Sequence, residues 1–156
     1  MTNHAKFPRT LVGGVSLPRL LVGTNWFLGW SHTSLAKDNF IKEYQTHARI
    51  EAMLSVFLEY GIDAVMGPLS AHLDDSIRAV EQKSGQHITR IYTPAFDLNP
   101  GAAPEDQAEA VFDRCAQLGA TFCMPHQSVT DALIDRRAGV IRDIDQYACM
   151  IRARGM

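Results

Sequence analysis

Strand-like and helix-like segments alternate four times along this chain, and this alternation constrains its fold more than any other feature. Short apolar runs at residues 20–25, 62–66, 87–93 and 121–124 are each followed by a longer segment with helical character. Parallel strands need a crossover connection between them, usually a helix, so repeated strand–helix units predict a parallel sheet. The sequence therefore predicts an α/β fold.

The helix-like segments carry apolar residues at helical spacing and recognisable end signals. Ser70 suits a helix N-cap, and Gly61 and Gly85 suit the left-handed position that follows a helix. Residues 26–37 and 94–104 read as loops between strands and helices. The predicted helices span residues 38–60, 70–85, 104–119 and 131–153, the last with a break near residue 139.

The N-terminal segment has a different pattern from the strand–helix units. Residues 9–17 place the pair Gly13–Gly14 between two short strand-like runs. Two consecutive glycines favour the positive φ angles of a two-residue turn. The segment is therefore predicted to be a β-hairpin that precedes the first unit.

Four strand–helix units are half the number found in a closed (β/α)8 barrel, which typically has ~250 residues, whereas this chain has 156. We expect residues 1–156 to form a single half-barrel domain, with 1–19 as the hairpin and 20–156 as four βα units. The outer strands, at 20–25 and 121–124, would then have unpaired edges, which recruit other chains. The sequence predicts a homodimer, or a higher even oligomer, in which these strands pair between copies and close eight strands. The alternative is a fragment of a longer barrel or a non-catalytic module that only self-associates.

Composition and charge narrow the partners and the location of the protein. The hydrophobic fraction is 46% and the charged fraction 21%, as in ordinary globular proteins, and the net charge is -2. No basic excess favours nucleic acid, and no apolar run approaches the ~20 residues that span a membrane. The first ten residues lack the apolar core of a secretory signal. These features predict a cytoplasmic protein without nucleic-acid or membrane partners.

Function in a barrel of this type sits at the C-terminal ends of the strands. His126 follows the fourth strand and is the predicted catalytic residue, because imidazole can donate or accept a proton near neutral pH. The aromatic ring of Trp26 can stack on a ring-shaped ligand or simply pack against protein. The predicted ligand-binding residues are Asn25, Trp26, His32, Asp97 and Gln127, and the expected ligand is a small polar molecule, such as one that bears a carbonyl group.

The spacing of histidine, aspartate and cysteine residues along the sequence does not favour a metal site or a disulfide bond. His32, Asp97 and His126 have the chemistry of metal ligands but not the close spacing of known motifs, so no metal is predicted. Cys115 and Cys123 flank a predicted helix–strand turn, and a disulfide between them is conceivable. Free buried thiols in a reducing cytoplasm are the expectation.

TLVGGVSLPRLLVGTNWFLG, at residues 10–29, resembles the opening of aldo/keto reductases, in which a hairpin seals the barrel floor and leads into the first strand. LEYGIDAVMGP, at 58–68, resembles the second strand, and LGATFCMPHQ, at 118–127, resembles the fourth strand with a histidine at its end. The resemblance implies a (β/α)8 barrel of which this chain supplies the N-terminal half.

The resemblance also implies NADPH as cofactor and carbonyl reduction by an Asp, Tyr, Lys and His set. Of that set only His126 is matched. The Asp position falls on Met66, and the third strand ends Tyr92-Thr93-Pro94 without a lysine. The family's cofactor phosphates bind in the second half of the barrel. The resemblance therefore favours a related scaffold that binds a small ligand, while the usual proton donor and its lysine partner are missing.

Overall fold

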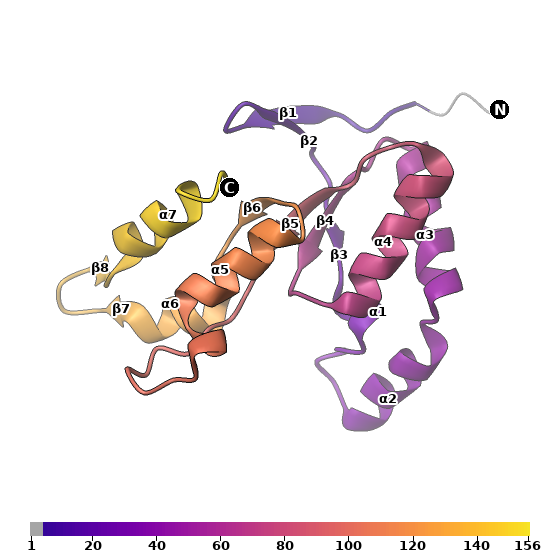
Figure 1. Cartoon of the computed structure of the whole chain (residues 1–156). Helices are drawn as coiled ribbons and strands as arrows, with labels where there is room; N and C mark the ends of the chain where they lie inside the picture. The colour runs from indigo at the N-terminus through magenta and orange to yellow at the C-terminus, as the bar shows by residue number, and fades with distance from the viewer. Residues whose placement is uncertain (1–4) are drawn as a thin grey trace. The chain divides into compact units, whose positions relative to one another are not determined.

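The computed structural model describes residues 5–156, and its elements follow the predicted alternation (Figure 1). The chain divides into two compact units, one through Thr89 and one from Arg90, which are described separately below. The elements are β1 (Arg9–Val12), β2 (Val15–Pro18), β3 (Val22–Gly23), α1 (Asn25–Leu28), α2 (Leu35–Tyr44), α3 (His47–Glu59), β4 (Ala64–Gly67), α4 (Ala71–Ser84), β5 (Thr89–Tyr92), η1 (Pro104–Asp106), α5 (Ala108–Gln117), β6 (Ala120–Cys123), α6 (Gln127–Leu133), β7 (Ile134–Asp135), β8 (Val140–Ile141) and α7 (Ile144–Arg152).

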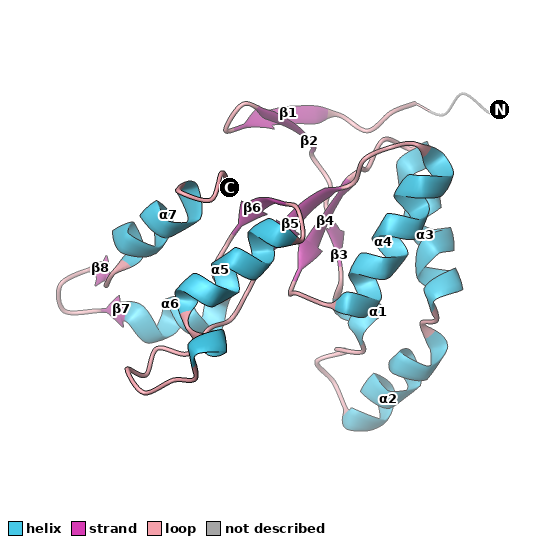
Figure 2. Cartoon of the chain, viewed as in Figure 1, coloured by secondary structure: helices cyan, strands magenta, loops and turns pink. Residues whose placement is uncertain are grey.

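The strands β3, β4, β5 and β6 form one parallel sheet in that order, which confirms the predicted α/β fold (Figure 2). β3 and β6 are the outermost strands of this order, so each has one neighbour in the sheet. No helix in the described residues is long and apolar enough to cross a membrane.

The predicted hairpin is confirmed. β1 and β2 pair antiparallel, with Val12 opposite Val15, and Gly13 and Gly14 both have positive φ angles, 56° and 82°. Positive φ at both central residues is the geometry of the turn whose twist matches that of two paired strands.

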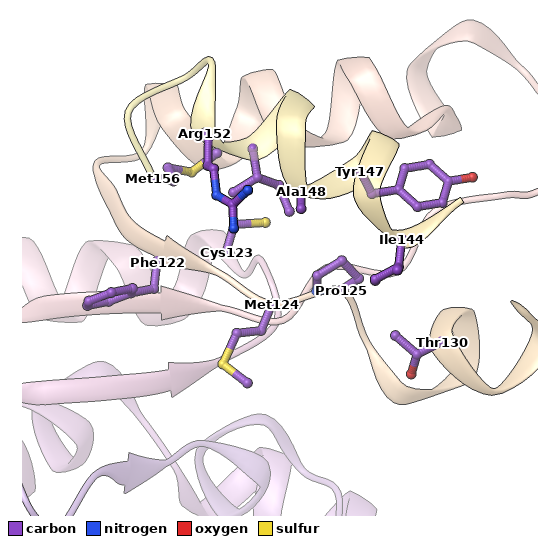
Figure 3. Close-up of a pocket in the computed structure, with 11 residues that line it drawn as sticks. Phe122, Cys123, Met124, Pro125, Thr130, Ile144, Tyr147, Ala148, Arg152 and Met156 are labelled. Atoms are coloured by element: carbon purple, nitrogen blue, oxygen red, sulfur yellow. The ribbon is translucent and has the colours of Figure 1, made fainter. Parts of the chain in front are cut away.

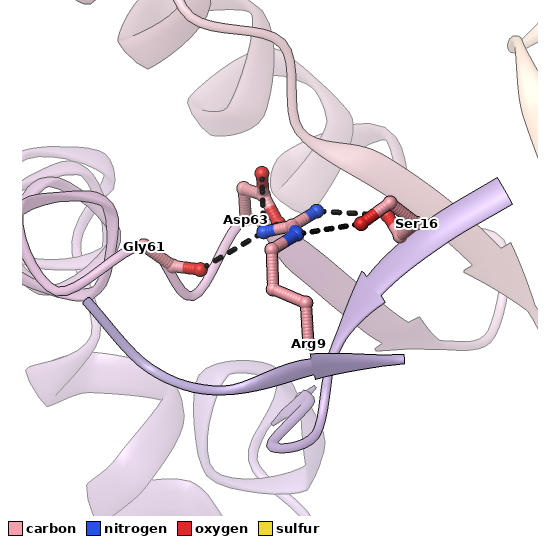
Figure 4. Close-up of polar contacts among 4 residues, drawn as sticks. All are labelled: Arg9, Ser16, Gly61 and Asp63. Carbon is pink, nitrogen blue, oxygen red and sulfur yellow. Dashed lines mark hydrogen bonds and ion pairs between the residues drawn. The ribbon is translucent and has the colours of Figure 1, made fainter. Parts of the chain in front are cut away.

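Arg9 fastens this hairpin to the segment that leads into β4 (Figure 4). Its guanidinium donates to both carboxylate oxygens of Asp63, at 2.9 and 3.1 Å, and to the carbonyl of Gly61 at 3.2 Å. It also donates to the hydroxyl and the carbonyl of Ser16, at 2.9 and 2.8 Å. The planar guanidinium has five N–H donors on three nitrogens and can make these bonds together, whereas a lysine ammonium has three donors on a single nitrogen.

We expect Arg9→Met to lower the free energy of unfolding by about 1–2 kcal/mol, since the variant leaves a partly buried carboxylate without its cation. Urea unfolding followed by circular dichroism measures the loss. Lys6→Met is the matched control, because Lys6 is exposed and donates a single hydrogen bond to the carbonyl of Glu59. An equal loss in both variants would mean that the contacts of Arg9 add nothing beyond surface charge.

The core of the first unit lies between β3, β4 and the helix pair α3 and α4. Val22 and Val65, paired in register on β3 and β4, pack in one cluster with buried side chains of both helices. The helix contributions come from Ile50, Leu54, Leu58, Leu73, Ile77 and Val80. α4 begins and ends as predicted, with the Ser70 hydroxyl accepting from the backbone N–H of Leu73 and Gly85 in the left-handed conformation.

The long helix predicted over residues 38–60 is wrong. The structure has two helices, α2 and α3, separated by Gln45 and Thr46. Thr46 is extended, with φ -73° and ψ 161°, and serves as the N-cap of α3. The predicted loop at 26–37 contains the short helix α1, and the first strand is only two residues long.

The core of the second unit is built around the aromatic side chains of Phe96, Phe112 and Tyr147. The rings of Phe96 and Phe112 meet edge to face with centroids 5.4 Å apart, and Tyr147 lies 5.0 Å from Phe96. Phe112 is fully buried. These rings join α5 and α7 to the segment after β5.

The last predicted helix, over residues 131–153, is also wrong, although a break near Gly139 was expected. α6 ends at Leu133, and the strands β7 and β8 form a small hairpin before α7. The Asp135 carboxylate accepts from the backbone N–H groups of Arg137 and Ala138, and Gly139 has φ 67°. An aspartate that bonds its own backbone favours a turn over a helix. The predicted third helix likewise begins with a 3-10 turn, η1, rather than with α-helix.

Candidate functional site

In the first unit, the structure brings together two of the predicted ligand-binding residues. The Asn25 side-chain amide lies 2.8 Å from Nε2 of His32. Because the amide nitrogen can only donate, Nε2 accepts, and the proton of the neutral ring is on Nδ1. His32 has φ 56°, a conformation that side chains other than glycine rarely adopt. The contact therefore holds His32 in an unusual backbone position beside the end of β3.

The rest of the segment that follows β3 is shaped by charged contacts. Trp26 is half exposed, and the ammonium of Lys37 lies 4.9 Å from its ring centroid. Asp38 accepts from the hydroxyl and the backbone N–H of Ser31, and these two bonds lower the pKa of its carboxyl. Trp26 is thus available to a ligand but already has a cation as a partner.

A cavity of about 330 Å³ lies where β3 and β4 end. Phe27 and Leu28, on the helix after β3, give it an apolar wall, and Ser70, at the start of α4, lines it after β4. Gln45, at the end of α2, lines it too, is 9% exposed, and has a side-chain oxygen, Oε1, without a hydrogen-bond partner. The complete lining is Phe27, Leu28, Lys42, Gln45, Ser70 and His72.

A chain of hydrogen bonds leads from this cavity into the helix pair. His72 Nε2 lies 3.2 Å from the backbone carbonyl of Gln45, and its Nδ1 lies 2.9 Å from Nε2 of His47. His47 Nδ1 lies 2.9 Å from the hydroxyl of buried Ser76. Since a carbonyl can only accept, His72 donates from Nε2. The Ser76 hydroxyl donates its single proton to the backbone carbonyl of His72 at 3.1 Å, so towards His47 it is an acceptor. Both ring nitrogens of His72 are thus engaged, and this residue positions Gln45.

Sequence reasoning missed this cluster. His47 and His72 are separated by 25 residues and lie on the helices α3 and α4. Ser70 and His72 lie in the segment after β4, at the start of α4, so the strand-end rule could have included them. No local signal marks His47.

In the second unit, His126 and Gln127 lie at the start of α6. His126 Nδ1 accepts from the backbone N–H of Ser128 at 3.2 Å and lies 2.8 Å from its hydroxyl, so this side chain caps the helix. Gln127 donates to Asp131. Nε2 of His126 carries the ring proton in the neutral form and faces no partner among the described residues.

Asp97 has a different setting from His126. Its Oδ1 accepts from the backbone and the side chain of Asn99, at 2.9 and 2.6 Å. It lines a cavity of about 360 Å³ with Phe96, Glu109 and Gln146, and His126 is not among the residues of that lining. The prediction that Asp97 and His126 contribute to one ligand site therefore stays a prediction.

A more apolar cavity, of about 410 Å³, lies between β6 and α7 (Figure 3). Phe122, Met124 and Tyr147 are part of its lining, and Arg152 extends over it in the figure. Cys123 also lines it. Hydrogen bonding with Cys115 and burial raise the pKa of the Cys123 thiol.

All three cysteines are free thiols, as predicted, but they differ in burial. Cys115 is buried, Cys123 is half-buried, and Cys149 is exposed, which corrects the expectation that all are buried. Within residues 5–156, no three His, Cys, Asp or Glu side chains are grouped so that they could hold a metal ion.

The cavity beside β3 and β4 is the place in the described chain where strand ends, a cation and an unpartnered buried polar group coincide. In comparisons with protein-family models, curated proteins and solved structures, nothing matches this chain.

Proposed function

We propose that this chain binds a small polar ligand at the C-terminal ends of its parallel strands, in the cavity beside β3 and β4. The observation that carries the proposal is the composition of that cavity. Four polar residues, Lys42, Gln45, Ser70 and His72, line it together with the apolar residues Phe27 and Leu28, and converging polar groups beside apolar side chains are a feature of small-molecule sites. The volume of about 330 Å³ is in the range of such sites.

The place of the cavity in the fold supports the same proposal. In parallel α/β proteins, ligands bind outside the carboxyl ends of the strands. Gly67 ends β4, and a Cβ added to it would overlap the side chain of Thr24, which is buried at the end of β3. The Thr24 hydroxyl also donates to the carbonyl of Met66. This close approach fixes the two strand ends that flank the site.

The proposed relation to aldo/keto reductases concerns the scaffold. At the end of β4, Met66 occupies the position of the catalytic aspartate implied by the resemblance, and β5 ends without a lysine. His126 does not line this cavity, so carbonyl chemistry at its open Nε2 is proposed as a separate possibility within the second unit. NADPH remains the cofactor that the resemblance implies.

An NMR titration tests where a ligand binds. Amide resonances of the ¹⁵N-labelled protein are followed while NADPH, glyceraldehyde and a set of small acids, amides and sugars are added. We expect chemical-shift changes grouped at Leu28, Ser70 and His72. Changes grouped at His126 and Gln127 would instead move the site to the second unit, and no changes with any compound would contradict ligand binding.

A second proposal, self-association, is favoured by the outer strands of the sheet. β3 and β6 each have one neighbour, and an edge strand readily accepts another strand. Both edges belong to the same chain, so one twofold axis can pair β6 of each copy with β3 of the other and give eight strands. This is the proposed route by which the half-barrel becomes a closed barrel.

A further inference from the structure

We infer that the ligand of the cavity beside β3 and β4 is a small hydroxy acid, with its carboxylate on Lys42 and its hydroxyl donating to Oε1 of Gln45. The inference rests on the proposed ligand site and names the chemistry it accepts. Three features of the cavity lead to it: a free cation, an acceptor that lacks a donor, and an apolar wall.

The cation is Lys42. Within residues 5–156 its ammonium forms no ion pair at contact distance. Its nearest anionic neighbour on α2 is Asp38, one turn earlier, which accepts hydrogen bonds from Ser31 and whose pKa the charge of Lys42 helps to lower. The methylene groups of Lys42 lie directly over Gly29, where an added Cβ would overlap them. Gly29 has φ 79°, the conformation that favours glycine. The Lys42 stem is therefore packed in place, which reduces the entropy lost when its ammonium binds an anion.

The start of α4 adds to the attraction for an anion. The first N–H groups of a helix have no partner within it, and this end carries a partial positive charge. Ser70 and His72, both at this end, line the cavity. The Asp74 carboxylate lies in the same first turn and offsets part of that charge, so Lys42 is the principal anion-binding group.

The unpartnered acceptor is Gln45. Its side chain is nine-tenths buried, yet Oε1 accepts no hydrogen bond. A buried acceptor without a donor costs free energy that a ligand hydroxyl can recover. The terminal torsion of glutamine is soft, so the amide can turn toward a donor in the cavity. The backbone of Gln45 is held in place by the hydrogen bond from His72 to its carbonyl.

The apolar wall defines the rest of the ligand. Phe27 is buried, and Leu28 is half-buried beside it. A short branched hydrocarbon fits such a wall, whereas a sugar would leave its hydroxyl groups unpaired there. The carboxylate, the hydroxyl and the hydrocarbon together describe a small α-hydroxy acid with an aliphatic side chain.

Three probes separate the parts of this inference in the same NMR titration. They are 2-hydroxyisovalerate, its neutral amide, and isovalerate, which lacks the hydroxyl. We expect 2-hydroxyisovalerate to shift the amides of Leu28 and Ser70 and to bind about tenfold more tightly than either of the other probes, as expected for one charged or one buried hydrogen bond.

Variants assign the two contacts. Lys42→Met keeps the packed stem and should remove the preference for the acid over its amide, whereas Lys37→Met, on the same helix but outside the cavity, should not. Gln45→Leu should remove the preference for the hydroxyl, and it also removes a buried oxygen that has no hydrogen-bond partner.

Each outcome bears on the inference. Equal binding of the acid and its amide, with shifts at Leu28 and Ser70, would overturn the inference and leave the proposed ligand site intact. Equal effects of Lys37→Met and Lys42→Met would overturn the role of Lys42. No shift with any of the three probes at millimolar concentration would overturn the inference, and the broader titration described above then decides the proposed function separately.

Discussion

Gly23→Glu is expected to convert a dimer into a monomer. If β3 and β6 pair between copies, the wild-type protein has a mass in solution of twice 17.3 kDa, and the variant has 17.3 kDa. Sedimentation equilibrium at tens of micromolar measures both. The size of the effect comes from placing a charge on the face of the sheet that closure would bury, which costs several kcal/mol for each copy.

The position of Gly23 makes this a test of closure rather than of folding. Successive side chains of a strand point to opposite faces, so Gly23 faces away from the core cluster that contains its neighbour Val22. A Cβ added to Gly23 meets nothing within 4 Å. A side chain is therefore tolerated by the single chain, whereas the interior of a closed barrel is filled with side chains. A charge at Val22 itself would unfold the first unit and report nothing about its edges.

Gly101→Glu is the matched control. Gly101 also has open space around an added Cβ, and it lies in the loop between β5 and η1. This variant adds the same charge and should keep the wild-type mass. A wild-type mass of 17.3 kDa, or a Gly23→Glu variant that stays dimeric, would contradict self-association through these strands.

The parts of the fold that were predictable depend on local chemistry. The hairpin at Gly13–Gly14 and the helix between Ser70 and Gly85 are determined by residues that favour one backbone conformation, a turn or a helix end. The alternation of strands and helices is likewise a repeating local pattern. Such features can be recognised without knowing what the segment packs against.

The errors occurred where distant contacts decide the structure. The break between α2 and α3 places Gln45 against His72, 27 residues away, and no local sequence pattern around Gln45 indicates that contact. The same contact forms part of the candidate site. A helix predicted to run through Gln45 therefore missed both the break and the site. The error at the hairpin 134–141 has a different cause. Asp135 and Gly139 indicate a turn locally, but the apolar residues of this segment have helical spacing, and the prediction followed that spacing.

In the second unit, Phe112→Ala is expected to have a large effect on stability. Phe112 is fully buried and contacts Phe96 edge to face, with Tyr147 at 6.4 Å. Truncation of a buried phenylalanine costs about 3–5 kcal/mol, because apolar contact is lost and a cavity remains. A domain is stabilised by only about 5–15 kcal/mol in total. The variant should therefore leave this unit largely unfolded at moderate urea concentrations.

Amide hydrogen exchange measures this loss separately in each unit, because every protected amide reports its own opening free energy. The amides of α5 are expected to exchange hundreds-fold faster in Phe112→Ala than in the wild type, which corresponds to about 3–5 kcal/mol. Phe112→Leu, which keeps most of the volume, should lose less than about half as much. If Phe112→Ala changed the opening free energy of α5 by less than about 1 kcal/mol, the site would have collapsed around the truncation. The aromatic cluster would then not be what joins α5 and α7 to the segment after β5.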